Sequence, residues 1–65
     1  MSRKSFKIGV QLVGHTYVRY ILARSDRQYW DGDDWTPHRN RALLYYHLDL
    51  IQQDRRRLLA EQRPN

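Results

Sequence analysis

The chain has 65 residues, of which 40% are hydrophobic and 29% charged, and its formal net charge is +5. This length predicts one small basic domain over residues 1–65 with a limited core, and the composition excludes a disordered chain. The absence of cysteine excludes disulfides and thiolate metal sites and favours a cytoplasmic location, while no apolar stretch is long enough to span a membrane.

Apolar residues alternate with polar residues or glycine near the start of the chain. The apolar members of this pattern are Phe6, Ile8, Val10 and Leu12. A period of two predicts a strand over about 5–13 with one face towards a core. Further β-branched and aromatic residues predict strands over about 17–24 and 28–31, separated by the turn residues of 25–27.

The turn between the first two strands decides which side chains share a face. A two-residue turn would pair Val10 with Arg19 and place a charge in the core, which is costly. A three-residue turn over 14–16 pairs Val10 with Tyr20 instead, so we predict this register. The core face then adds Val18, Tyr20 and Leu22 to the first strand, and the outer face carries Lys7, Gln11, Tyr17, Arg19 and Ile21.

The C-terminal half predicts one helix over about 37–62. Thr36 suits the N-cap and Pro37 the first helical position. The apolar stripe of this helix is Leu44, Leu48, Ile51 and Leu58 or Leu59, interrupted by Arg55. An alternative makes 43–46 a short fourth strand, with a helix from about His47. The sequence therefore predicts an α+β fold, in which a three-stranded antiparallel meander packs on one C-terminal helix.

Residues 27–38 carry a local motif that includes two tryptophans. The matching residues are Tyr29, Trp30, Asp31, Gly32, Trp35, Thr36 and His38. The segment resembles the Y-W-D-G-x-x-W-T-x-H hairpin of a short bacterial domain of unknown function, which also recurs in small phage-like and plasmid-like proteins. The resemblance implies a tight turn flanked by packed tryptophans, and it implies no activity.

No residue pattern points to catalysis, a metal or a cofactor. The histidines His15, His38 and His47 have no thiol partner, and a domain this small does not enclose a water-excluding pocket. The acidic run over 31–34 lacks the residue order of a calcium loop. We therefore expect a protein that is not an enzyme, binds no cofactor and acts on no small-molecule substrate.

The basic and aromatic residues predict a small nucleic-acid-binding accessory module, either for DNA or for RNA. Cations mixed with aromatic rings can contact phosphates and stack on bases. The candidate residues are Lys7, Tyr17, Arg19, Arg24, Arg55, Arg56 and Arg57.

An alternative function uses the remaining aromatic residues. In this hypothesis the chain is a protein-interaction or self-association module, for example an inhibitor of the phage or plasmid type. Its candidate docking residues are Trp30, Trp35, Tyr45 and Tyr46. This alternative predicts a protein partner or a homodimer and no membrane contact.

Overall fold

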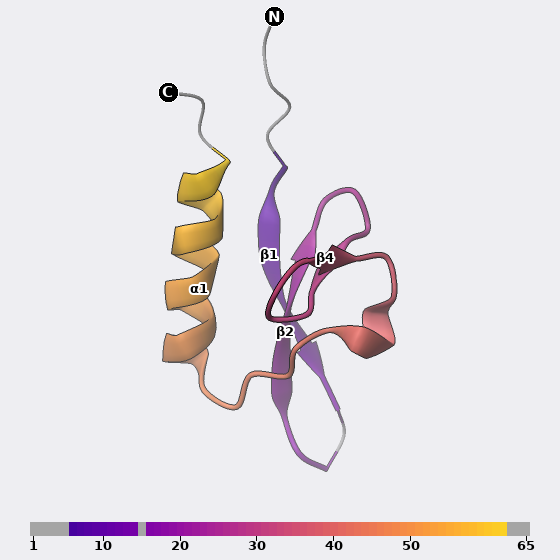
Figure 1. Cartoon of the computed structure of the whole chain (residues 1–65). Coiled ribbons are helices and arrows are strands. Elements are labelled where there is room, and N and C mark those ends of the chain that lie inside the picture. Colours follow the sequence, from indigo (N-terminus) through magenta and orange to yellow (C-terminus); the bar gives the residue numbers. More distant parts are fainter. Residues whose placement is uncertain (1–5, 15, 63–65) are drawn as a thin grey trace, which may run out of the picture.

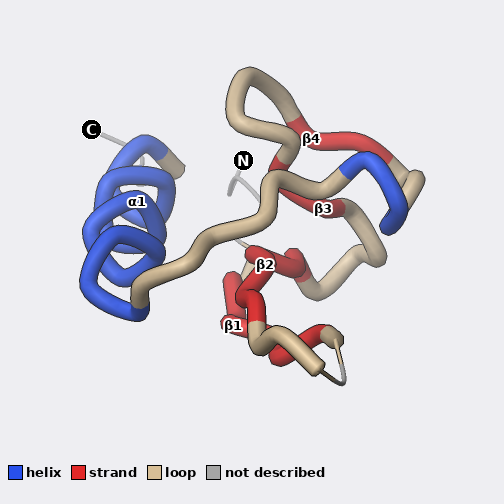
Figure 2. The backbone as a smooth tube through the Cα atoms, turned by 90° about the horizontal axis from the view of Figure 1, so that it is seen from below, coloured by secondary structure: helices blue, strands red, loops and turns tan. Residues whose placement is uncertain are grey.

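The structure is a computed structural model that describes residues 6–14 and 16–62. Four strands form one antiparallel sheet in chain order, and one C-terminal helix packs against β1 and β2. The elements are β1 Ile8–Val13, β2 Arg19–Arg24, β3 Tyr29–Trp30, β4 Trp35–Thr36, the 3₁₀ helix η1 Arg39–Arg41 and α1 Leu48–Glu61. Figures 1 and 2 show α1 on one side of the sheet and η1 on the other. The predicted α+β fold is confirmed, and β4 extends the expected meander by one short strand.

β1 and β2 pair two residues out of the predicted register. Val10 lies opposite Leu22 rather than Tyr20, and Val13 lies opposite Arg19. The predicted three-residue turn is therefore wrong, although Ser5 and His15 from the predicted segments lie outside the described residues. Because a shift of two residues leaves every side chain on the same face of the sheet, the predicted division into core-facing and outward side chains is correct. Arg19 lies on the side away from the core, as the sequence predicted.

Gly14 begins the first turn in a backbone conformation that glycine favours. Its φ is +97°, and a Cβ at this position would collide with the carbonyl oxygen of Tyr17. The backbone bends where only glycine avoids strain. Tyr17 and Val18, which were predicted to lie in the second strand, precede β2 instead and are exposed.

The core lies between α1 and the sheet. Its buried members are Ile8, Leu22, Trp30, Tyr45, Ile51 and Leu58. Four residues that were predicted to belong to the core are exposed, namely Leu12, Val18, Leu44 and Leu48. Figure 1 shows the reason for Leu12 and Val18: the far end of the β1–β2 hairpin extends beyond the first turn of α1, so the helix does not cover it.

The helix begins at Leu48, eleven residues after the predicted start at position 37. Thr36 ends β4 instead of capping a helix. Tyr45 forms an isolated antiparallel bridge with Tyr20, with N–H···O distances of 2.8 and 3.0 Å. Two backbone hydrogen bonds and a buried ring together outweigh the weak local preference for helix. The alternative with extended backbone over 43–46 is therefore closer to the structure, although the fourth strand is Trp35–Thr36.

Side chains from the C-terminal half satisfy part of the free edge of β1. Arg55 Nε on α1 donates to the carbonyl oxygen of Ile8 at 2.6 Å. The Gln62 side chain accepts from the N–H of Phe6 at 2.8 Å and donates to its carbonyl at 3.2 Å. This edge contact explains why an arginine interrupts the apolar stripe of the helix.

The β3–β4 hairpin brings the two tryptophans together across a tight turn, as the sequence predicted. Trp30 lies opposite Trp35, with ring centroids 5.4 Å apart in an edge-to-face arrangement. Oδ1 of Asp31 accepts the N–H groups of Asp33 and Asp34 at 2.8 and 2.7 Å. These backbone donors, of which Asp34 has the largest effect, hold the pKa of the Asp31 carboxyl below its ordinary value. The acidic run is thus an ordered turn in which one carboxylate caps the backbone.

We expect Gly32→Ala to lower the free energy of unfolding by about 1–2 kcal/mol. Gly32 has a φ of +103°, and an added Cβ would lie 3.3 Å from Cδ2 of Leu43. Gly9→Ala is the matched control, because a Cβ there meets nothing within 4 Å and its φ is not positive. Urea unfolding at neutral pH measures both variants. Equal stability of the two variants would contradict the strained turn.

Candidate functional site

The face of the sheet opposite α1, called the open face below, carries the outward side chains of β1 and β2. Gln11, Val13, Arg19 and Ile21 occupy this face, because they alternate with the core residues of the same strands. Ile21 was predicted to lie on this outer face, and it does. It is nevertheless only 1% exposed. η1 and the residues after it lie over the middle of the open face and form a half-open corner with the strands.

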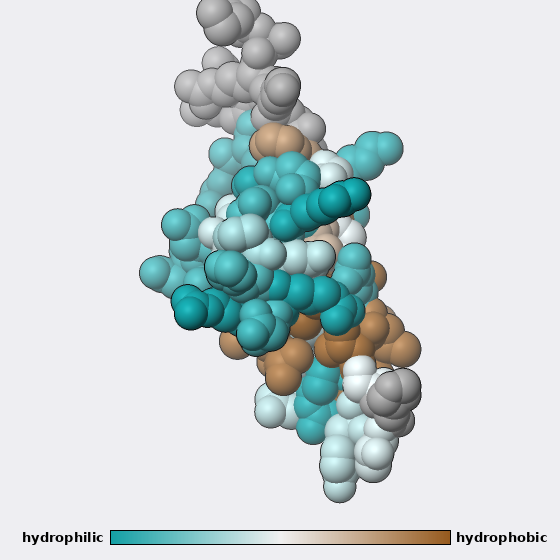
Figure 3. Space-filling model, turned by 90° about the vertical axis from the view of Figure 1, so that its right-hand side faces the viewer, coloured by the Kyte–Doolittle hydropathy of each residue, from teal (hydrophilic) through white to brown (hydrophobic). Residues whose placement is uncertain are grey.

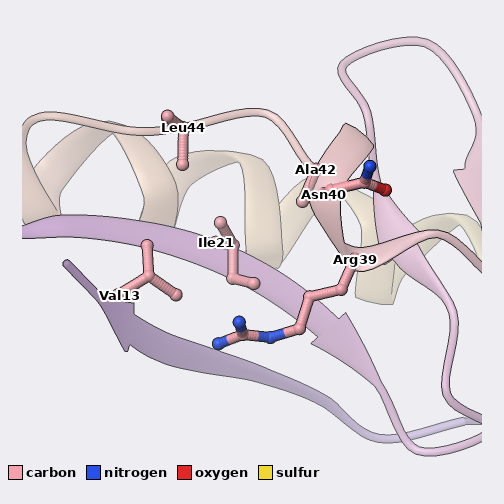
Figure 4. Close-up of a pocket in the computed structure, with 6 residues that line it drawn as sticks. All are labelled: Val13, Ile21, Arg39, Asn40, Ala42 and Leu44. Carbon is pink, nitrogen blue, oxygen red and sulfur yellow. The ribbon is translucent and has the colours of Figure 1, made fainter.

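This corner is a pocket of about 220 Å³. Its lining residues are Val13, Ile21, Arg39, Asn40, Ala42 and Leu44. Figure 4 shows the Arg39 side chain extending along the pocket with its guanidinium towards Val13. The pocket therefore joins an apolar floor from the strands to one cation and one amide from η1.

An arginine contacts the rings of two exposed tyrosines beside the pocket, and we call these three residues the Arg19 stack. The guanidinium carbon of Arg19 is 4.1 Å from the ring centroid of Tyr46 and 5.5 Å from that of Tyr17. Arg19 Nη1 also donates to the carbonyl of Val18 at 2.7 Å. A cation over a ring stabilises an exposed arrangement by about 0.5–1 kcal/mol. Because Arg19 lies opposite Val13 in the sheet, the stack borders the pocket.

Large apolar side chains are exposed around these two features. Tyr17 is 71% exposed, Tyr46 is 62% exposed and Leu44 is 48% exposed. Figure 3 shows hydrophobic side chains gathered on the lower half of the molecule, seen from the side that faces away from α1. Exposed apolar side chains that gather on one side of a small domain suit a surface that binds another molecule.

Arg24, a predicted nucleic-acid contact, already binds other side chains within the domain. It makes a two-point contact with the Asp26 carboxylate, with both N···O distances at 2.7 Å. Its guanidinium carbon also lies 4.6 Å from the Phe6 ring centroid and 4.8 Å from that of Trp35. The Arg24 guanidinium holds the pKa of the exposed Asp26 carboxyl below its ordinary value. These contacts give Arg24 a structural role at the end of β2.

The other predicted cations lie apart from the Arg19 stack. Lys7 is exposed, and its backbone carbonyl accepts the N–H of Ser25. This end of the β1–β2 pair lies opposite to the Arg19 stack, about 20 Å along β1 from Val13 at 3.4 Å per residue. Arg55 contacts the β1 edge, and Arg57 lies 3.8 Å from the Asp54 carboxylate. Arg56 is exposed on α1, on the other side of the sheet. Of the predicted set, the structure thus places only Tyr17 beside Arg19.

The aromatic residues of the alternative hypothesis divide between the core and the surface. Trp30 and Tyr45 are 8% and 7% exposed, and Trp35 is half-buried against Trp30. The Tyr45 hydroxyl donates to Oδ2 of Asp54 at 2.7 Å. Burial, together with this hydrogen bond, raises the pKa of Tyr45 well above its ordinary value. Tyr46 is the one of the four that is largely available to a partner.

None of the six lining residues was predicted as a site residue, although the sequence placed Ile21 on the outer face. The four that follow β4 are Arg39, Asn40, Ala42 and Leu44. Each lay inside the predicted helix, which placed Leu44 on its core stripe. The run of large residues over 43–46 was the one available signal, because it favoured an extended segment as the alternative. Extended backbone turns Tyr45 into the core and Leu44 and Tyr46 to the other side.

Within residues 6–14 and 16–62, no group of three His, Cys, Asp or Glu residues could hold a metal ion. Neither helix of that part of the chain is both long and apolar enough to cross a membrane. Compared with protein-family models, curated proteins and solved structures, the chain matches none of them. The resemblance of residues 27–38 therefore stays a prediction.

Proposed function

We propose that this chain is a small non-enzymatic module that docks a partner protein through its open face. The Arg19 stack carries the proposal, because it presents one guanidinium and two exposed tyrosine rings beside an apolar pocket. Tyrosine, arginine and tryptophan are enriched among the few residues that carry most of the binding energy at protein interfaces. A stack that is already ordered also loses less side-chain entropy on binding.

The apolar surroundings of the stack support the same function. Leu44 and Tyr46 are exposed beside buried Ile21, so a partner could cover a continuous surface that combines apolar side chains and cations. An apolar centre with aromatic residues and arginine is the usual composition of a protein interface. The proposed role needs no cofactor, and the absence of cysteine suits a reducing compartment such as the cytoplasm.

A peptide-display screen against the whole chain tests this function. Peptides selected from a random library would be synthesised and titrated against the wild type, Tyr46→Ser and Leu50→Ser. We expect Tyr46→Ser to weaken binding by about tenfold or more, as for a central interface tyrosine, and Leu50→Ser to change it less than about twofold. Leu50 is a suitable control because it is 52% exposed on α1. Failure to select any peptide, or equal effects of both variants, would contradict the proposal.

Nucleic-acid binding is the second candidate, and the Arg19 stack is also the observation that favours it. Exposed rings beside a cation can stack on the bases of a single strand, and the net charge of +5 would add attraction to phosphates. The candidate is weaker because Lys7, Arg24 and Arg55 lie apart from the stack or are occupied. Titration of a labelled duplex, a single strand and an RNA hairpin at two salt concentrations measures it. Binding no tighter than about 100 μM at low salt would exclude it.

A further inference from the structure

We infer that the open-face pocket binds an apolar side chain of an acidic segment of the partner protein, whose neighbouring carboxylate contacts Arg39. This inference rests on the proposed docking function and specifies the chemistry of the partner. Two features of the pocket carry it: the size and lining of the cavity, and the charges around its rim.

The size of the pocket fits a side chain rather than a whole small molecule. Its volume of about 220 Å³ corresponds to about seven waters at ~30 Å³ each. Sites for drug-sized ligands and cofactors start at about 300 Å³. Val13, Ile21, Ala42 and Leu44 supply an apolar lining, so expulsion of water by a leucine-sized side chain would be favourable.

The charges at the rim are positive and have no carboxylate partner in the described part of the chain. The ion pairs among those residues are Arg24–Asp26 and Arg57–Asp54. Arg39 lines the pocket, Arg19 borders it through Val13, and none of the lining residues is acidic. A guanidinium binds a carboxylate through two parallel hydrogen bonds. An acidic residue next to the inserted apolar side chain therefore complements this rim.

Short capped peptides test the inference directly on the whole chain. The probe is a pentapeptide with a central leucine between glutamate and aspartate, flanked by glycines, and its binding is followed by amide chemical shifts. We expect shifts at Val13, Ile21, Ala42 and Leu44, and weaker binding when lysines replace the acids or glycine replaces the leucine. Equal binding of the lysine peptide, or shifts confined to other parts of the chain, would overturn the inference.

Variants of η1 and of the pocket provide matched controls. Arg39→Gln should weaken binding of the probe by about tenfold, as for the loss of a charge-assisted hydrogen bond. Arg41→Gln should change it less than about twofold, because Arg41 belongs to the same short helix but does not line the pocket. Ala42→Leu should abolish binding by filling the pocket, and an otherwise unchanged amide spectrum shows that the variant folds.

Two further outcomes separate this inference from the docking function. If library-selected peptides bind Arg39→Gln and Ala42→Leu as tightly as the wild type while Tyr46→Ser weakens them, the pocket chemistry is wrong and the docking function stands. If the chain instead associates with itself, and Asp49→Lys on the exposed start of α1 abolishes that association, the occupant is a second copy and the inference is overturned.

Discussion

Replacing Ile51 with alanine is expected to lower the free energy of unfolding by about 2–5 kcal/mol. Ile51 is fully buried between α1 and the sheet, in one cluster with Leu22 and Leu58. The change removes most of a buried side chain and leaves a cavity, while alanine itself favours helix. Urea unfolding followed by tryptophan fluorescence measures the loss, because Trp30 belongs to the same core cluster.

Leu50→Ala is the matched control for this experiment. Leu50 precedes Ile51 on the same helix and is 52% exposed, so its truncation should cost less than about 0.5 kcal/mol. Small domains have a total stability of only about 5 kcal/mol or a little more, so Ile51→Ala should be close to unfolded. A larger effect of Leu50→Ala than of Ile51→Ala would show that α1 presents a different face to the sheet.

Tyr45→Phe is expected to destabilise the domain by about 1.5–3 kcal/mol, as for a hydrogen bond to a charged group. The buried hydroxyl donates to the Asp54 carboxylate and ties the 43–46 segment to α1. Tyr46→Phe is the neighbouring control, since Tyr46 is exposed and contacts Arg19 through its ring. The control should stay within about 0.5 kcal/mol of the wild type. Equal stability of the two variants would contradict the placement of Tyr45.

The same hydroxyl predicts a loss of stability in alkali. Burial raises the pKa of Tyr45 in the folded state above its ordinary value. The protonated phenol therefore stabilises the fold fully below pH ~10, the pKa in the unfolded chain, and this contribution is lost as the pH rises further. Unfolding measured at roughly pH 8 and pH 11 should show a smaller difference between wild type and Tyr45→Phe at the higher pH. A stability difference that grows with pH would contradict this predicted direction of the pH dependence.

The faces of the first two strands could be predicted from the sequence, but their register could not. Alternation along Ile8 and Val10 fixes which side chains point to the core, and only an even shift keeps Arg19 out of it. The size of that shift depends on the conformation of the whole turn, which includes Gly14 at a positive φ. A single sequence does not specify this conformation, so the predicted pairing was two residues off.

The start of the helix was missed because its competing contacts are distant in sequence. Thr36 and Pro37 are good local signals for a helix start. Tyr45, however, pairs with Tyr20 through the backbone and with Asp54 through its hydroxyl. These partners lie 25 and 9 residues away, and together they hold the segment extended.

The candidate site was partly predictable, because alternation shows which side chains face outward but does not reveal contacts between distant residues. Tyr17 and Arg19 were placed on the outer face from alternation and are exposed and half-exposed there. Arg39 was missed as a lining residue because the predicted helix enclosed its segment. Arg55 was assigned to nucleic acid because its partner, the Ile8 carbonyl, belongs to a strand 47 residues earlier. Tertiary contacts of this kind decide which cations remain available to a ligand.

The central claim, that the open face is a docking surface, is tested most directly by mapping where a selected peptide binds. The measurement is the set of amide chemical-shift changes across the whole chain when a library-selected peptide is titrated into it. We expect the largest changes at Val13, Ile21, Leu44 and Tyr46, which surround the pocket and the Arg19 stack. Largest changes at the acidic turn over 31–34 or around Arg56 on α1, with the open face unaffected, would contradict the claim.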